Sequence, residues 1–317
     1  MTRSKTDAKK LIEISRINAK MVKNPGGLIK RADEFYSNIL NGITRHIADR
    51  HREIHFVFIA GPSASGKTTS ANLLRRKLAW FGIHAVTVSL DNFFIDNDKI
   101  MPEEDGSFDF EKPEVIDIRL FNLCMHELLD KREAKFPVFD FHKHARSDKT
   151  LEIKMRQDNA VILIEGIHAL NPALYDAEIN EHSVKIYVVP NRHFAYRNEI
   201  VLSANALRLM RRMYRDHLTR GKSVADTLNM WPSVNRGTEL YVKPYKKDAD
   251  FVVDTTHAYE PYLYKNVLLP LLDSVEPRAQ AQNLIRPLER LKAQVTENDI
   301  SATSLINEFL GKESMFY

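Results

Sequence analysis

Short apolar runs alternate with amphipathic helical patterns through the middle of this chain. The run at 54–60 ends at a glycine, and a helical pattern over 66–81 follows it directly. Later runs also predict buried strands, at 84–90, 161–164, 184–189 and 251–253. Strands that are apolar throughout and alternate with helices are typical of a parallel sheet with helices on both faces. The pattern therefore predicts an α/β fold.

The two ends of the chain have helical patterns of their own. Apolar positions recur at helical spacing from Leu11 to Met21, and a second helical stretch runs from about 28 to 50. Asn-Pro-Gly-Gly at 24–27 predicts a turn between them. The tail from about 276 also reads as helical and polar. We expect a helical N-terminal extension over 1–50, a core domain over 51–275 and a helical C-terminal extension over 276–317.

Composition narrows the class of protein. Hydrophobic residues make up 44% of the chain and charged residues 28%, which is ordinary for a globular protein. No apolar run approaches the roughly 20 residues of a membrane span, and the N-terminus lacks the apolar core of a secretory signal. The single cysteine, Cys124, cannot form an internal disulfide. We expect a cytoplasmic protein without a membrane or nucleic-acid partner; homo-oligomerisation stays open.

The loop after the first predicted strand matches G-x-x-x-x-G-K-[ST] in full. In this pattern glycines let backbone N–H groups turn inward to phosphate oxygens, and the following helix adds the positive end of its dipole. Lys67 is expected to reach the β- and γ-phosphates, and the Thr68 hydroxyl to bind Mg²⁺. The expected cofactors are ATP and Mg²⁺. The residues predicted here to bind ATP are Gly61, Ser63, Ala64, Ser65, Gly66, Lys67, Thr68 and Thr69.

Three acidic residues follow predicted strands: Asp91, Glu165 and Asp254. Ligands of an open parallel sheet bind beyond the carboxyl ends of its strands. A kinase acting on a hydroxyl needs a carboxylate to accept the proton and another oxygen ligand for Mg²⁺. Asp91 and Glu165 are the candidates, with capping of the next turn as the alternative for each. Asp254 precedes two threonines and reads more easily as a cap.

Four arginines recur at i, i+3, i+4 and i+7 and so share one face of a predicted helix: Arg208, Arg211, Arg212 and Arg215. Arg220 and Lys222 flank Gly221, where this helix is expected to end. Like charges on one stripe are unfavourable unless an anion lies opposite. We interpret about 205–222 as a helical lid over ATP; a solvated basic face or a nucleic-acid backbone contact is the alternative.

Read together, these motifs resemble the uridine kinase and phosphoribulokinase superfamily, in particular bacterial uridine-kinase-like nucleoside kinases. The resemblance runs from about Ile54 to Leu272, and the segment 300–311 also resembles the C-terminal end of that bacterial group. Besides the phosphate loop it is carried by S-L-D-N-F-F at 89–94, F-D-F-E-K-P-E-V-I-D at 108–117, P-V-F-D-F-H-K-H-A-R at 137–146, I-L-I-E-G-I-H-A-L-N-P at 162–172, R-R-M-Y-R-D-H-L-T-R-G at 211–221 and K-P-Y-K-K-D-A-D at 243–250.

The resemblance implies transfer of the ATP γ-phosphoryl group to the 5′-hydroxyl of a nucleoside, giving a nucleoside 5′-monophosphate and ADP. The implied catalytic residues are Asp91 as general base, Lys67, Arg212 and Arg215. The implied ATP contacts outside the loop are Arg215, Arg220 and Lys222, and the implied metal ligands are Thr68, Glu165 and Asp91. The implied substrate contacts are Asp91, Glu111, Phe139, His144, Arg212 and Met230.

Three of these positions depart from the common family pattern. Glu111 replaces an aspartate that holds the ribose, Phe139 a tyrosine beside the base, and Met230 a glutamine. A base pocket without hydrogen-bonding groups discriminates poorly among bases. The sequence therefore indicates a nucleoside more firmly than uridine. The alternatives are a kinase of another small alcohol, such as a sugar or a pantothenate-like compound, and a catalytically inactive nucleotide-binding regulatory protein.

Overall fold

The computed structural model describes residues 11–96, 100, 109–140, 143, 145–155, 159–276 and 278–312. Its centre is a five-stranded sheet in the order β10-β7-β2-β6-β3, and every neighbouring pair is parallel. The strands of this sheet are β2 (Phe56–Ala60), β3 (His84–Ser89), β6 (Ala160–Glu165), β7 (Ser183–Val189) and β10 (Phe251–Asp254). The predicted parallel α/β sheet is therefore confirmed.

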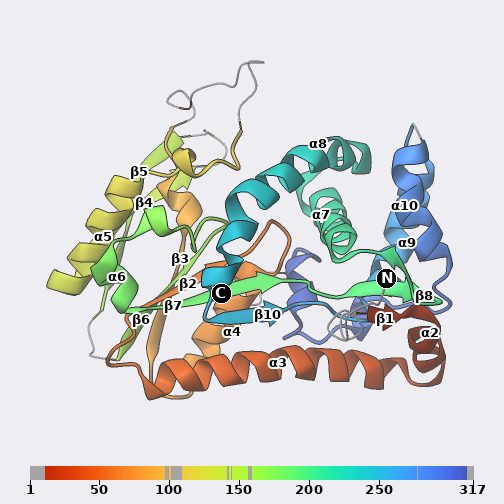
Figure 1. Ribbon diagram of the computed structural model, residues 1–317, viewed down its shortest axis with the longest axis horizontal. Helices are drawn as coiled ribbons and strands as arrows, with labels where there is room; N and C mark the ends of the chain where they lie inside the picture. The colour runs from red at the N-terminus through yellow and green to blue at the C-terminus, as the bar shows by residue number, and fades with distance from the viewer. Residues whose placement is uncertain are drawn as a thin grey trace.

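Helices cover both faces of this sheet, and the alternation along β2 shows why. Val57 and Ile59 belong to one apolar core, whereas Phe56 and Phe58 belong to a second core on the opposite face. In Figure 1 the long helix α3 runs along the lower side of the sheet, and α5 and α6 lie to the left. The helices are α2 (Ile14–Lys23), α3 (Pro25–Asp49), α4 (Lys67–Ala79), α5 (Ile118–Lys131), α6 (Ala177–Glu181), α7 (Ala204–Arg220), α8 (Val224–Gly237), α9 (Glu260–Asp273) and α10 (Arg278–Glu289).

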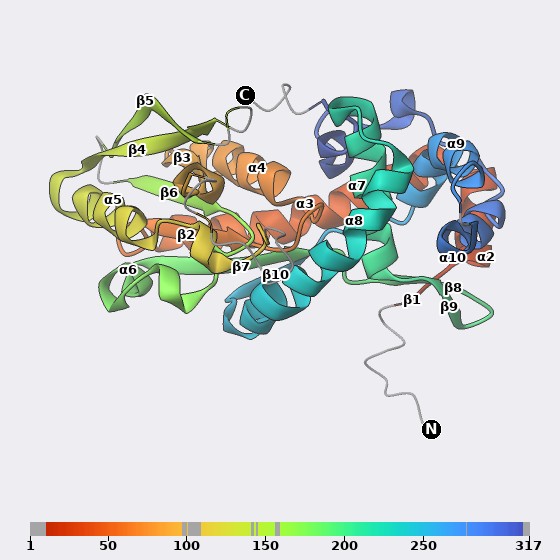
Figure 2. The ribbon, with the colours of Figure 1, turned by 90° about the horizontal axis from the view of Figure 1, so that it is seen from above.

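Two small sheets flank the central one (Figure 2). An antiparallel hairpin joins β4 (Glu133–Asp140) to β5 (Ala145–Lys154). At the other end of the molecule, β1 (Leu11–Glu13) pairs in parallel with β8 (His193–Tyr196), which pairs with β9 (Glu199–Leu202). The periodicity of the sequence did not predict these strands, because exposed and polar positions interrupt the continuous apolar run that marks a buried strand.

The predicted break between two helices is confirmed, but it is confined to Asn24 and does not extend over 24–27: α2 ends at Lys23. Helix α3 begins at Pro25, and the Asn24 side chain caps it by accepting a hydrogen bond of 2.8 Å from the Gly27 N–H. Proline is well suited to the first helical position because it lacks the N–H that would be unpaired there. Gly26 and Gly27 therefore lie inside a 25-residue helix rather than between two helices.

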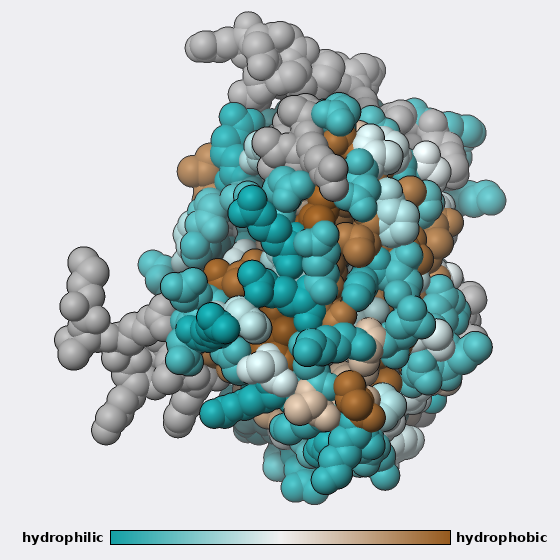
Figure 3. Space-filling view, turned by 90° about the vertical axis from the view of Figure 1, so that its right-hand side faces the viewer, coloured by the Kyte–Doolittle hydropathy of each residue, from teal (hydrophilic) through white to brown (hydrophobic). Residues whose placement is uncertain are grey.

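The first and last segments that the structure describes contribute to the core. Ile14, Ile285 and Leu310 belong to the same apolar cluster as Val57 of the central sheet. The C-terminal segment is helical only as far as Glu289; two short 3₁₀ turns follow, Glu297–Asp299 and Leu305–Glu308. The side of the molecule shown in Figure 3 is mostly hydrophilic, with smaller apolar areas between the polar side chains. Within the described ranges, no helix combines the length and the apolar character that crossing a bilayer requires.

The Asn24 cap leads to a prediction about stability. Replacing Asn24 with alanine should lower the free energy of unfolding by about 1 kcal/mol, because one N–H at the start of α3 loses its partner. Urea denaturation measures this change. The matched control is Asn38→Ala, an exposed position inside the same helix, where alanine should be neutral or slightly stabilising. Equal losses in the two variants would contradict the capping role.

Candidate functional site

The predicted phosphate loop lies between β2 and α4, at the carboxyl edge of the central sheet. Gly66 is the residue before α4 and has φ 99°, a left-handed conformation that favours glycine. A Cβ on Gly61 would lie 2.0 Å from the Val188 carbonyl oxygen of β7, so the loop starts in close contact with the neighbouring strand. At both positions of the motif, therefore, a residue with a side chain would be sterically unfavourable.

The loop is equipped to hold an anion. The first N–H groups of α4 have no partner within the helix and carry the positive end of its dipole. The Lys67 ammonium lies at the same turn and donates a long hydrogen bond of 3.4 Å to the Pro62 carbonyl oxygen. Within the described part of the chain, the buried hydroxyls of Ser65 and Thr69 have no hydrogen-bond partner. These unsatisfied donors fit a phosphate chain and are costly to bury without one.

Two carboxylates lie near Lys67. Glu165 is the last residue of β6, and Asp91 lies in the 3₁₀ turn Leu90–Phe93 directly after β3. Burial raises the pKa of Glu165 to about 7; the Lys67 charge opposes this shift and the Asp91 carboxylate adds to it. Burial also raises the pKa of Asp91, while Lys67 and Arg220 oppose the shift. The fold thus brings the two predicted carboxylates and the loop lysine within electrostatic range of one another.

The residues predicted to hold magnesium are consistent with its chemistry. Mg²⁺ is usually bound by one or two carboxylates together with substrate phosphates and water, rather than by a cage of protein ligands. Thr68 is partly exposed at the start of α4, where its hydroxyl is accessible to an ion beside a bound phosphate. Among the described residues, no group of three histidine, cysteine or acidic side chains forms a metal site by itself.

Glu111 faces the same cluster from the segment before α5. Burial raises the pKa of Glu111, and the nearest opposing charges are Arg212, Lys67 and Arg208. Its Oε2 atom is buried and has no hydrogen-bond partner in the described ranges, so the carboxylate can accept from a ligand hydroxyl. The side chain also packs against the Cα of Gly237 in α8, where a Cβ would lie 2.4 Å from the Glu111 Cβ.

His168 is a site residue that the sequence reasoning missed. It is buried, lies close to Lys67, Glu111 and Tyr241, and burial lowers its pKa to about 4, so the ring is neutral at pH 7. Its position three residues after Glu165, at the end of the central strand β6, is the sequence signal that could have identified it.

Two of the four arginines on the predicted face of α7 bond to groups of the protein itself. Arg211 is fully buried and makes a bidentate ion pair with Glu260, with hydrogen bonds of 2.7 and 2.8 Å. It also donates to the Ser65 carbonyl oxygen, and Arg208 donates to that of Ser63. For these two arginines, the anion or acceptor opposite is protein rather than a phosphate. They connect α7 to the backbone of the phosphate loop.

The other lid arginines gather around Asp216. This buried carboxylate lies 3.4 Å from Arg212, 2.8 Å from Arg215 and 3.5 Å from Arg220. Arg212 also donates to the Ser63 hydroxyl at 3.0 Å, which places it at the loop. Gly221 ends α7 in a left-handed conformation, as the sequence predicted. Asp216 therefore holds Arg212, Arg215 and Arg220 together at the C-terminal half of α7.

The structure places two of the residues predicted to contact a base, Phe139 and Met230, in different surroundings. Phe139 is buried at the end of β4, where its ring meets that of Phe94 edge to face and its N–H donates to the Asn92 side chain. It therefore adjoins the turn that carries Asp91. Met230 is 42% exposed on α8, with its sulfur 3.9 Å from the Lys222 ammonium. His144 lies outside the described residues.

The capping interpretation of Asp254 is confirmed. Its Oδ1 accepts hydrogen bonds from the N–H groups of Asn191 and Thr256, each at 3.0 Å, and its other oxygen pairs with Arg192 at 2.9 Å. The carboxylate is thus used to order the turn that follows β10.

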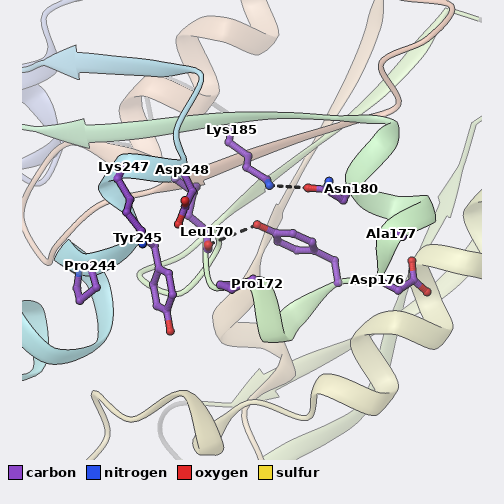
Figure 4. Close-up of a pocket in the computed structure, with 11 residues that line it drawn as sticks. Leu170, Pro172, Asp176, Ala177, Asn180, Lys185, Pro244, Tyr245, Lys247 and Asp248 are labelled. Atoms are coloured by element: carbon purple, nitrogen blue, oxygen red, sulfur yellow. Dashed lines mark hydrogen bonds between the residues drawn. The ribbon is translucent and has the colours of Figure 1, made fainter.

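A cavity of about 600 Å³ lies elsewhere, between the segments around α6 and residues 244–248. Figure 4 shows Lys185 pointing to Asn180, with Tyr245 and Lys247 on the opposite wall. None of the residues predicted to bind ATP, metal or substrate lines it. The cavity is therefore separate from the cluster around Lys67.

Comparisons with known proteins show the family to which this chain belongs. The model of the Phosphoribulokinase / Uridine kinase family matches residues 56–259. A uridine kinase from Staphylococcus aureus is 30% identical over 197 residues, which are 62% of this chain and 84% of that protein. A possible uridine kinase from Bacillus stearothermophilus is similar in structure over 63% of this chain and 89% of its own, at 20% identity and TM-score 0.40. A phosphoribulokinase from Rhodobacter spheroides aligns over 63% of this chain and 69% of its own, at 18% identity and TM-score 0.42.

The buried ion pair yields a stability prediction. Arg211→Ala should lower the free energy of unfolding by about 3–5 kcal/mol, because Glu260 would remain buried without its partner. Chemical denaturation followed by circular dichroism measures the loss. Arg45→Ala, at an exposed position on α3, is the control and should change stability by less than about 0.5 kcal/mol. If Arg211→Ala lowers the free energy of unfolding as little as Arg45→Ala does, the ion pair does not stabilise the fold.

The raised pKa of Glu165 yields a pH prediction. Its pKa is about 7 in the folded protein and about 4.3 in the unfolded chain. The folded state therefore binds the proton more tightly, and stability decreases as pH rises from about 4.3 to 7. Glu165→Gln cannot ionise, so the variant should gain stability relative to the parent protein between pH 5 and pH 8. Urea unfolding at both pH values measures this; a constant difference would contradict it.

Proposed function

The chain belongs to the phosphoribulokinase/uridine kinase family of phosphotransferases, and we propose that it transfers the γ-phosphoryl group of ATP to the 5′-hydroxyl of a nucleoside. The observation that carries the proposal is the convergence of Asp91 and Glu165 with Lys67 at the carboxyl edge of the sheet. A phosphate cradle and a buried carboxylate on opposite sides of one site are the parts that transfer to an alcohol requires.

Each charged group has a role in this proposal. Asp91 accepts the proton of the 5′-hydroxyl, and its raised pKa brings it closer to that task. Lys67 and Arg215 neutralise charge on the transferring group, and Arg212 lies near the acceptor. Arg220 and Lys222 contact phosphates from the lid. Mg·ATP, when bound, would supply the phosphoryl group, and Thr68, Glu165 and Asp91 would hold the metal.

The acceptor side of the proposal rests on Glu111 and Phe139. The unpartnered Oε2 of Glu111 can accept a hydrogen bond from a ribose hydroxyl. Phe139 adjoins the Asp91 turn and offers an aromatic face to a base, without a hydrogen-bonding group of its own. The proposed substrate class is therefore the nucleosides, with weak discrimination between bases. The second candidate substrate is another small alcohol, because neither Phe139 nor Met230 has a group that hydrogen-bonds specifically to a base.

The test is ADP release with a panel of acceptors: uridine, cytidine, adenosine, a simple sugar and pantothenate. We expect turnover with at least one nucleoside and none with the sugar or pantothenate. Asp91→Asn should reduce kcat at least about 100-fold, because the proton acceptor is lost.

Asp176→Asn, an exposed carboxylate that pairs with His126, is the matched control and should keep the kcat of the parent protein. Turnover confined to the sugar or pantothenate would replace the nucleoside by that alcohol. ATP binding without turnover on any acceptor would favour a regulatory protein.

A further inference from the structure

The C-terminal segment reaches into the phosphate loop. Glu308 lies at the end of the 3₁₀ turn Leu305–Glu308, and its Oε2 accepts a hydrogen bond of 3.1 Å from the backbone N–H of Thr69. Thr69 is the third residue of α4, so this N–H is one of the unpaired donors at the positive end of the helix. A carboxylate therefore occupies a donor that the loop would offer to a phosphate oxygen.

Neighbouring contacts hold this carboxylate in place. A Cβ on Gly66 would lie 2.5 Å from the Leu305 side chain, so the turn rests directly on the glycine that begins the cradle. Phe309 lies under the guanidinium of Arg211, 4.8 Å from its centre to the ring. Leu305 and Phe309 are fully buried and Glu308 is 6% exposed. The position of the segment is thus set by packing and does not result from a loose tail.

The phosphate loop is a site for anions, and the Glu308 carboxylate is one anion that it already holds. Glu308 contributes, with Asp91, to the raised pKa of Glu165, so three carboxylates share the field of one cluster. Bound phosphates bring further negative charge to the same N–H groups. Carboxylate and phosphate oxygens compete for such donors, because both are stabilised by the same helix dipole.

We propose that Glu308 is a built-in competitor for nucleotide phosphate: it accepts the hydrogen bond of the Thr69 N–H, and a nucleotide phosphate has to displace it to use this donor. The proposal rests on the proposed use of ATP at this loop, and it assigns to the C-terminal segment a control of nucleotide affinity. Removal of the Glu308 charge should therefore tighten nucleotide binding, whereas a residue that helped to hold the nucleotide would weaken it when replaced.

The experiment is isothermal titration calorimetry of the full chain with ADP and with pyrophosphate, and with adenosine as a ligand that carries no phosphate. Glu308→Gln keeps the size of the side chain and removes its charge. It should lower the Kd for ADP and for pyrophosphate by on the order of tenfold and leave the Kd for adenosine unchanged. Glu308→Asp withdraws the carboxylate by one methylene and should show a smaller change of the same sign, so the test does not depend on one variant.

Glu289→Gln is the control, since it removes an exposed charge from the same part of the chain and should leave all three affinities unchanged. Unchanged or weaker ADP binding in both Glu308 variants would overturn the proposal. Equal tightening for adenosine would also overturn it, because the effect would then not act on phosphate. The ADP and pyrophosphate titrations contain no nucleoside acceptor, so failure of the proposed nucleoside kinase activity would leave their result intact.

Discussion

The N-terminal turn of α4 is the feature on which the rest of the site depends. Its backbone N–H groups have no partner within the helix, and the glycine at position 66 lets the chain turn sharply enough to expose them. Donors of this kind are costly to bury without an anion. Lys67, the lid arginines and the carboxyl edge of the sheet surround this turn. In the described structure Glu308 already satisfies one of the donors.

The charged residues of the site divide into those that build it and those left to act on a ligand. Arg211 forms an ion pair with Glu260 and donates hydrogen bonds to carbonyl oxygens of the loop. Because it is also buried, it supports the structure of the site. Lys67, Asp91 and Glu165 have no comparable ion pair among the described residues, and the pKa values of both carboxylates are raised by burial. Perturbed pKa values of this kind cluster at functional sites.

Much of the core and the phosphate loop could be predicted from local sequence. The five central strands are short runs rich in apolar residues, and the loop motif directly follows the first of them. The edge strands β1, β8 and β9 could not be recognised in this way, because they are short and only partly buried. The start of α3 was misplaced because Pro-Gly-Gly reads as a turn, although Asn24 caps a helix there.

The sequence by itself determined the parallel α/β class, the phosphate loop and the candidate carboxylates, because these depend on short-range patterns and on the rule that parallel strands end at one edge. Only the tertiary structure decided which arginine of α7 pairs with Glu260, that His168 lies beside Lys67, and that Glu308 meets Thr69. Arg211 and Glu260 are 49 positions apart in the sequence, and Thr69 and Glu308 are 239 positions apart. No local pattern encodes such contacts, since they result from the way the packed elements bring distant side chains together.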